Sequence, residues 1–341
     1  MSKFVKKFFN DLDNDKLNKI LIIRLSSLGD VLLTTPIIRA LKKKYNEAEI
    51  DYIVKQNYSD ALRYNPYLKN VIYYSETKQF RNQLRESKYD LVIDLQNNFR
   101  SRRIVSSLNS ASIRFKKPTL KKFLLVNFKI NLYNNVKQIP ILYAESIRNL
   151  ELDDKGLDLF LPGGIKSEIP DGKQFIGFCP GAKHFTKRWP EEYFIELGNN
   201  ITEAGYSIII FGGKDDKEIC NNIHQSVHNS ICICGEDNIF EIAINMRKCK
   251  LIICNDSGLM HTATAMNIPV IAIFGSSAKE FGFTPYSSPN VHNLVLENNS
   301  LFCRPCSHYG KNHCPKKHFK CMKDISPFFV KEQILSLIKT I

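Results

Sequence analysis

The sequence lacks the features that mark membrane-spanning and secreted proteins. No apolar run approaches the roughly 20 residues that a spanning helix needs. Residues 1–10 have neither the apolar core nor the cleavage site of a secretory signal, and their basic, amphipathic pattern permits a short helix on a membrane surface. The ten cysteines follow no regular spacing, which favours reduced thiols over a disulfide framework. We therefore expect a cytoplasmic protein, whose basic N-terminal residues could touch a membrane surface.

Acidic residues are absent from one long part of the chain. With 48 Lys and Arg against 34 Asp and Glu, the net charge is +14, which predicts an anionic partner such as phosphate, a membrane surface or nucleic acid. Much of this excess lies between Asp94 and Glu145, a stretch without any carboxylate. A solvated basic face is the alternative interpretation. The basic residues of this stretch are Arg100, Arg102, Arg103, Arg114, Lys116, Lys117, Lys121, Lys122, Lys129 and Lys137.

Short β-branched runs alternate with amphipathic stretches, a pattern typical of parallel α/β sheets. It predicts two doubly wound halves joined by a Pro/Gly-rich linker at 161–172, with domains at 1–160 and 161–326 and a terminal helix at 327–341. Ligands of such sheets bind at the carboxyl ends of the strands. Strands are expected at 19–24, 50–54, 91–95, 175–178, 207–211, 231–233, 251–254 and 270–274, and helices at 30–45, 77–87, 191–204 and 240–247.

Ser26 to Asp30 follow the first predicted strand and open a helix. Gly29 lets a ligand approach the backbone, and a helix N-terminus can hold an anion. Asp30 is either a cap of this helix or a carboxylate placed to act as a general base. The residues alone favour the cap.

Residues 180–190 lie between another predicted strand and helix. Gly181, Lys183, Thr186 and Lys187 give this loop a flexible point, a hydroxyl and positive charge, which together suit a diphosphate. The order of residues is not that of a P-loop. Trp189, the only tryptophan, is expected to pack beneath the loop.

Residues 255–265 follow the apolar strand at 251–254. Ser257 and Gly258 allow close backbone approach, and the next helix can direct amide groups at phosphate. Asp256 can accept hydrogen bonds from sugar hydroxyls. His261, one turn into the helix, is more often structural than catalytic. Asp256-Ser257-Gly258 alone is a weak signal.

The combination of these motifs in this order resembles the ADP-heptose:lipopolysaccharide heptosyltransferases, glycosyltransferase family 9. The resemblance runs from about residue 19 to 330 and includes the segment 94–101. It implies a GT-B fold, in which two Rossmann-like domains face each other across a cleft. It also implies inverting transfer of heptose from ADP-heptose to a lipopolysaccharide inner-core acceptor, with no cofactor required for catalysis.

The resemblance assigns roles to individual residues. Asp30 would be the base and Lys187 would neutralise the leaving diphosphate, the largest charge that develops in the transition state. Asp215 or Asp216 would contact the ribose. Basic residues would hold the acceptor at an anionic leaflet, which implies a protein peripherally associated with the inner membrane. The implied donor-binding residues are Gly181, Ala182, Lys183, Thr186, Asp216, Asp256, Ser257, Gly258 and His261, and the implied acceptor-binding residues are Ser27, Gly29, Gln96, Arg100 and Arg103.

Four cysteines cluster near the C-terminus with the spacing C-x2-C-x7-C-x6-C. This spacing suits a tetrahedral zinc site, although its loops are shorter than those of a zinc ribbon. A structural zinc ion, an iron–sulfur cluster and free or redox-active thiols all remain open. The candidate ligands are Cys303, Cys306, Cys314 and Cys321.

Two alternative functions remain. One is a transferase of the same fold that uses another nucleotide-sugar or acceptor, because a few pocket residues decide the donor. The other is a basic, zinc-containing nucleic-acid-binding protein, although no helix-turn-helix or aromatic RNA-binding pattern appears. We expect ADP-heptose, the core acceptor and the membrane surface as partners, and no nucleic acid.

Overall fold

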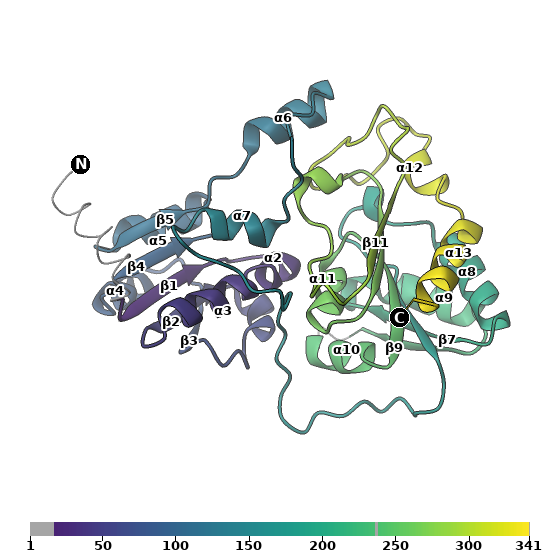
Figure 1. Cartoon of the computed structure of the whole chain (residues 1–341), viewed down its shortest axis with the longest axis horizontal. Helices are drawn as coiled ribbons and strands as arrows, with labels where there is room; N and C mark the ends of the chain where they lie inside the picture. The colour runs from purple at the N-terminus through teal and green to yellow at the C-terminus, as the bar shows by residue number, and fades with distance from the viewer. Residues whose placement is uncertain (1–16, 236–237, 341) are drawn as a thin grey trace. The chain divides into compact units, whose positions relative to one another are not determined.

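The computed structural model describes residues 17–235 and 238–340, so the helix considered for residues 1–10 lies outside it. The chain forms two compact units (Figure 1). Unit 1 contains residues up to 117 with 140–154 and 158–160; unit 2 contains 118–139, 155–157 and everything from 161 onward. Within the described ranges, no helix has the length and apolar character to cross a membrane.

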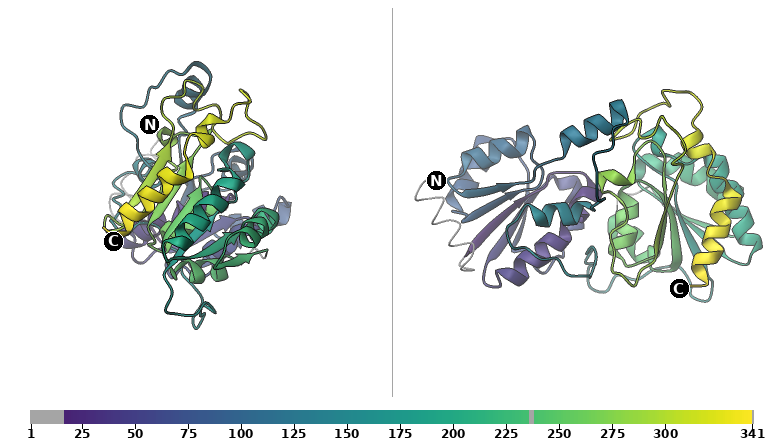
Figure 2. Two further views of the ribbon diagram at one scale, coloured as in Figure 1. Left: turned by 90° about the vertical axis from the view of Figure 1, so that its right-hand side faces the viewer. Right: turned by 45° about the horizontal axis from the view of Figure 1, so that its top comes forward.

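Unit 1 is a five-stranded parallel sheet with helices on both faces (Figures 1 and 2). The strand order is β3-β2-β1-β4-β5. The three central strands carry the predicted apolar runs and are buried, whereas the edge strands β3 and β5 are only partly buried and were missed. The strands are β1 (Lys19–Ile23), β2 (Glu49–Val54), β3 (Asn70–Tyr73), β4 (Leu91–Asp94) and β5 (Ala111–Arg114), and the helices are α2 (Leu28–Leu32), α3 (Thr35–Lys44), α4 (Lys78–Glu86), α5 (Phe99–Ser107) and α7 (Ile139–Glu145).

The single helix predicted for residues 30–45 is wrong, because the chain forms α2 and α3 with a break between them. Pro36 has no N–H for the carbonyl of Leu32, so the helix cannot continue through this point. The hydroxyl of Thr35 donates to that carbonyl instead, at 2.8 Å. Asp30 therefore lies on a short helix of its own.

Unit 2 is a six-stranded parallel sheet in the order β11-β10-β9-β6-β7-β8. The five strands predicted from the sequence are confirmed, and the partly buried edge strand β11 was missed. The strands are β6 (Phe175–Cys179), β7 (Ser207–Gly212), β8 (Ser230–Cys234), β9 (Cys249–Asn255), β10 (Val270–Phe274) and β11 (Asn293–Glu297), and the helices are α8 (Glu191–Glu203), α9 (Lys217–Ser226), α10 (Ile239–Met246), α11 (Gly258–Ala265), α12 (Lys320–Lys323) and α13 (Pro327–Ile338).

Residues 118–139, with helix α6 (Thr119–Phe128), group with unit 2 although they precede the linker in sequence. Leu125 packs in one apolar cluster with Ala278 and Phe281. The backbone N–H of Ile139 donates to the carbonyl of Gly282 at 2.9 Å. The sequence division at residue 160 thus differs from the contact grouping here, because apolar contacts with 278–283 hold the segment.

Arg39 holds the late segments of unit 1 on α3. Its side chain is 6% exposed and pairs with Asp153, at 2.6 Å, and with Asp158. We predict that Arg39→Gln lowers the free energy of unfolding by about 2–4 kcal/mol, because breaking a largely buried ion pair leaves charge uncompensated. Urea denaturation measures this. Lys69→Gln, which breaks the exposed pair with Glu49, should change it by less than about 1 kcal/mol; equal effects of the two variants would contradict the prediction.

Candidate active site

The loop after β1 carries an ion pair between Arg24 and Asp30. A guanidinium nitrogen of Arg24 lies 2.5 Å from Oδ1 of Asp30. The backbone N–H and the hydroxyl of Ser27 both donate to Oδ2 of Asp30, each at 3.1 Å. Arg24 also donates to the Tyr143 hydroxyl and to the Leu95 carbonyl, each at 2.9 Å. The carboxylate is therefore fixed from both sides.

These contacts correct the cap interpretation of Asp30. Ser27 is the N-cap of α2, while Asp30 is the third helical residue and binds back to Ser27. The carboxylate itself thus occupies the N-terminus of this five-residue helix. Burial alone would raise the pKa of Asp30, but Arg24 and Ser27 outweigh it and hold the pKa below its usual value. Asp30 is ionised at neutral pH and can accept a proton.

Gln96 supports the same loop from the end of β4. Its Oε1 accepts a hydrogen bond from the backbone N–H of Leu25 at 2.9 Å. The side chain of Asp94 in turn accepts from the backbone N–H of Gln96 at 3.1 Å and from the Ser101 hydroxyl at 2.9 Å. Gln96, predicted to bind the acceptor, therefore has its amide oxygen engaged in positioning the loop that leads to Ser27 and Gly29.

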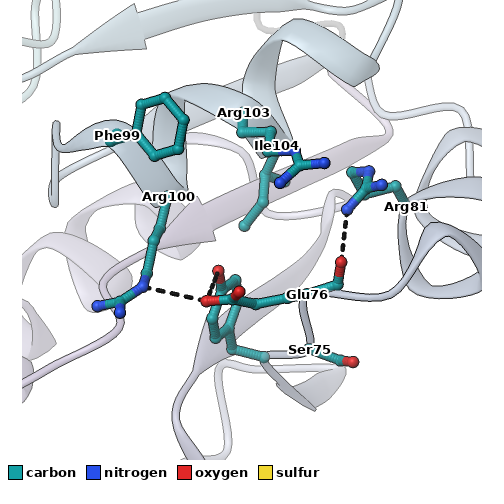
Figure 3. Close-up of a pocket in the computed structure, with 8 residues that line it drawn as sticks. Ser75, Glu76, Arg81, Phe99, Arg100, Arg103 and Ile104 are labelled. Atoms are coloured by element: carbon teal, nitrogen blue, oxygen red, sulfur yellow. Dashed lines mark hydrogen bonds and ion pairs between the residues drawn. The ribbon is translucent and has the colours of Figure 1, made fainter.

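The predicted acceptor residues Arg100 and Arg103 lie together on α5, in the lining of a pocket of about 220 Å³ (Figure 3). Arg100 donates to the carboxylate of Glu76 at 3.2 Å, and Arg81 donates to the Glu76 carbonyl at 2.7 Å. Three arginines against one carboxylate leave the pocket positively charged. The full lining is Tyr74, Ser75, Glu76, Arg81, Phe99, Arg100, Arg103 and Ile104.

In unit 2, Asn255 at the end of β9 holds the loop that follows β6. Its side-chain amide donates to the Pro180 carbonyl at 2.7 Å, and its oxygen accepts from the Trp189 backbone N–H at 3.0 Å. Trp189 is fully buried, as expected, and its indole donates to the Ile325 carbonyl at 2.9 Å. Residues 180–189 are thereby tied at both ends to the carboxyl end of the central strand β9.

Lys187 and Asp256 form an ion pair beside the carboxyl end of β9. Nζ of Lys187 lies 2.6 Å from Oδ2 of Asp256, which also accepts a hydrogen bond from the Ser277 hydroxyl at 2.6 Å. Burial opposes ionisation of Asp256, but Lys187, Ser277 and the nearby His261 lower its pKa below the usual value. The lysine side chain is thus held at the carboxyl end of β9, beside the start of α11.

Further predicted donor residues surround this pair. The carboxylate of Asp216 packs so closely on Gly181 that a Cβ added there would lie 2.1 Å from it. The hydroxyl of Ser257, the N-cap of α11, is buried and has no hydrogen-bond partner within the described residues. An unsatisfied hydroxyl beside free amide groups at a helix start suits a phosphate oxygen.

The remaining predicted donor-binding residues differ in whether their polar atoms are free to bind a ligand or are already hydrogen-bonded within the protein. Lys183 is exposed, and Ala182 is buried with its carbonyl accepting from Arg188 at 2.7 Å. Thr186 has its hydroxyl engaged by the protein: it donates to Ser276 at 2.9 Å and accepts from the backbone N–H of Lys311 at 2.8 Å. The structure thus gives Thr186 a bracing contact to the cysteine-containing loop.

Arg304, between the first two clustered cysteines, fixes the segment that carries Ser277. Its guanidinium donates to the carbonyls of Gly275 at 2.7 Å and Ser277 at 3.0 Å. It also pairs with Glu297 at 2.8 Å, and both side chains are 6% exposed. Through Ser277, Arg304 positions the Lys187–Asp256 pair.

The four clustered cysteines lie near one another without forming a ligand set. Burial raises the pKa of the Cys306 thiol, and so do the neighbouring Cys303 and Cys314. Burial, together with Cys306 and its neighbours, raises that of Cys321 to about 12. Among residues 17–235 and 238–340, no group of three or more His, Cys, Asp or Glu side chains is arranged to hold a metal ion. The zinc site stays a prediction.

Comparison with known proteins places the chain in a family. The family model described as glycosyltransferase family 9 (heptosyltransferase) matches residues 77–314. Lipooligosaccharide heptosyltransferase 2 of Campylobacter jejuni is 30% identical over 333 residues, which cover 94% of this chain and 98% of that protein. The chain belongs to glycosyltransferase family 9.

Solved structures agree with this assignment. The Escherichia coli ADP-heptose lipopolysaccharide heptosyltransferase II is similar with a TM-score of 0.72 and 25% identity, over 94% of this chain and 99% of its own length. A family 9 glycosyltransferase from Veillonella parvula superposes with a TM-score of 0.76 at 23% identity, over 95% and 98% of the two chains, and shows the fold alone. The predicted GT-B class, with two doubly wound parallel sheets, is confirmed, and the chain is a glycosyltransferase.

Sequence reasoning missed several residues of this family 9 site. Arg24 gave one available signal, a cation directly after a buried strand and six residues before Asp30. Asn255 lay within the motif considered, but its bracing role depends on partners 66 and 75 residues away. Ser277 and Arg304 act through contacts that no local pattern encodes.

We predict that Arg304→Gln weakens binding of ADP by about tenfold, because the segment 275–277 loses its anchors and Ser277 no longer fixes Asp256. Isothermal titration calorimetry with ADP measures this. Arg247→Gln, at an exposed position of the same unit, should leave the affinity unchanged. Unaltered ADP affinity in a folded Arg304→Gln protein would show that Arg304 does not position the site.

Proposed function

We propose that this family 9 glycosyltransferase transfers heptose from ADP-heptose to an inner-core acceptor of lipopolysaccharide, either lipid A–Kdo or a core heptose. The proposal rests on family membership together with the Lys187–Asp256 pair at the start of α11. Relatives named as lipooligosaccharide or lipopolysaccharide heptosyltransferase 2, from Campylobacter jejuni and Escherichia coli, match 94% of the chain. The acceptor oxygen bonds to the anomeric carbon as the bond from that carbon to the diphosphate breaks, and this single displacement of ADP inverts the configuration of the carbon.

The donor half of the reaction uses unit 2. Lys187 moves its positive charge from Asp256 to the diphosphate and stabilises the negative charge that develops as ADP leaves. Asp256 then accepts hydrogen bonds from the heptose hydroxyls. The Ser257 hydroxyl and the amide groups at the start of α11 bind phosphate oxygens, and Asp216, packed on Gly181, contacts the ribose. No cofactor is assigned a step.

The proton chemistry uses unit 1. Asp30 accepts the proton of the acceptor hydroxyl while that oxygen attacks the anomeric carbon. Arg24 keeps Asp30 ionised and oriented, and Ser27 holds the second carboxylate oxygen. Arg100 and Arg103, in their positively charged pocket, bind anionic groups of the acceptor.

We infer a cytoplasmic protein at the inner membrane from the acceptor that the proposal assigns. Transfer of another nucleotide-sugar by the same site remains the second candidate, since the donor is decided by few pocket residues. A comparison of ADP-, UDP- and GDP-sugars as thermal stabilisers discriminates these donors, because a ligand that binds the folded state raises the apparent melting temperature.

We predict that Asp30→Asn lowers kcat by about 10²- to 10⁴-fold, the usual contribution of a general base, with ADP affinity unchanged. The lowered pKa of Asp30 also sets the pH dependence. Because the ionised form is active, turnover should lose Asp30's contribution only when the pH falls below the usual value of 3.8. Transfer assays from acidic to neutral pH measure both. An Asp30→Asn enzyme with wild-type kcat would remove Asp30 as the base.

We predict that Lys187→Ala lowers kcat by about 10²- to 10³-fold and also weakens ADP binding, because the charge opposite the leaving group is lost. Steady-state transfer assays and calorimetry separate the two effects. Lys250→Ala, an exposed lysine at the opposite end of β9, serves as the matched control. Loss of ADP affinity with unchanged kcat would restrict Lys187 to ground-state binding.

A further inference from the structure

Two segments without acidic residues meet on unit 2. Residues 118–139 contain four lysines and no Asp or Glu, and residues 298–323 contain one arginine, five lysines and no Asp or Glu. Nζ of Lys122 lies 2.6 Å from Nε2 of His308, and Lys129 donates to the Pro305 carbonyl at 2.7 Å. Helix α6 therefore lies against the loop that precedes α12 (Figure 1). We call these two segments the α6–cysteine-loop surface.

The inner side of α6 is anchored by apolar and cationic contacts. Leu125 is buried against Ala278 and Phe281. Nζ of Lys122 lies over the rings of Phe281 and Phe283, 5.9 and 5.6 Å from their centroids. One side of α6 is thus packed against the rest of unit 2, and these contacts hold the helix in a fixed orientation.

The outer side exposes large apolar side chains to water. On α6, Leu120 is 68% exposed, Phe123 53% and Phe128 61%. On the loop, Phe302 is 84% exposed and Tyr309 is 72% exposed. Scattered exposed apolar residues are common, but this number on two adjoining segments indicates a binding surface. Ile130, Leu132 and Val136 extend the exposed series after α6.

Cationic side chains are interleaved with these apolar groups. Lys121, next to Leu120 and Phe123, is exposed, and the loop adds further exposed lysines near Tyr309. Glu280 is an acidic residue in contact with the surface, where its carboxylate accepts a hydrogen bond from Asn131 at 3.4 Å. Long lysine side chains beside aromatic and aliphatic groups are typical of segments that rest in a bilayer interface. The exposed loop lysines are Lys311, Lys316, Lys317 and Lys320.

We propose that the α6–cysteine-loop surface docks unit 2 on an anionic lipid bilayer, with the exposed apolar side chains entering the headgroup region. Each basic residue near an anionic surface adds electrostatic attraction, and burial of the apolar side chains adds to the affinity. A second copy of this chain is a poorer occupant, because two such surfaces would bring like charges together. The docking gives access to a membrane-held acceptor and in that sense rests on the proposed function.

The test is sedimentation of the full chain with vesicles of phosphatidylcholine, with and without phosphatidylglycerol. Leu120→Ser/Phe123→Ser should reduce partitioning into the anionic vesicles at least about tenfold, since the loss of one buried apolar side chain is enough to change a binding constant about tenfold. Lys316→Glu/Lys317→Glu should reduce it about tenfold or more, since two attractions become repulsions. Binding of the wild type should weaken strongly when phosphatidylglycerol is omitted.

Matched controls carry the same chemical changes elsewhere. Tyr73→Ser removes an exposed ring, 48% accessible, from the edge strand of unit 1, and Lys173→Glu/Lys250→Glu reverses two exposed lysines outside the surface. Their partitioning should equal that of the wild type. Equal loss in the controls, or undiminished binding in the two surface variants, would overturn the proposal. So would a change in oligomeric mass of the surface variants without loss of vesicle binding.

Transfer assays separate this proposal from the proposed function. With a water-soluble acceptor that lacks acyl chains, the surface variants should retain wild-type kcat, whereas their rate on acceptor embedded in anionic vesicles should fall about tenfold. Vesicle binding without any heptose transfer by the wild type would defeat the proposed function and leave the docking surface standing. Transfer to the soluble acceptor without any vesicle binding would defeat the docking surface alone.

Discussion

The ion pair between Lys187 and Asp256 is the interaction on which the proposed donor site depends. A lysine and a carboxylate 2.6 Å apart in a largely buried setting are stable only when further donors satisfy the carboxylate. Ser277 provides such a donor, and Arg304 holds the backbone of Ser277. The pair also fixes the lysine side chain at the carboxyl end of β9. The proposed diphosphate site is thereby held together by side chains of the protein itself.

Unit 1 also holds a charged side chain in a buried ion pair, but here the group of interest is a carboxylate. Asp30 is paired with Arg24 and fixed by Ser27, so that the carboxylate stays ionised despite burial. A depressed pKa makes Asp30 a weaker base, but it guarantees an unprotonated oxygen at neutral pH. Orientation then matters more than basicity. In both units a charged functional group is held by an opposite charge that the reaction itself does not consume.

The contact between α6 and the cysteine-containing loop links two otherwise separate features. The loop is tied to Thr186 through Lys311, and Thr186 precedes Lys187. The same loop supports α6 through Pro305 and its neighbours. The proposed membrane-docking surface and Lys187 therefore share one structural support. The cysteines of this loop, with their raised thiol pKa values, lie within that support.

The sequence by itself determined the buried elements and pointed to the loops that are proposed to carry the chemistry. The central strands and the motifs around Asp30, Lys187 and Asp256 could be predicted because each is a local pattern, an apolar run followed by small and polar residues. Edge strands were missed since partial burial weakens that pattern, and the break before α3 was missed although Pro36 signalled it. Only the tertiary structure decided which partners hold the functional groups, because Arg24, Ser277 and Arg304 act across distant parts of the chain. It likewise decided that residues 118–139 belong with unit 2, since apolar packing against 278–283 outweighs continuity along the sequence.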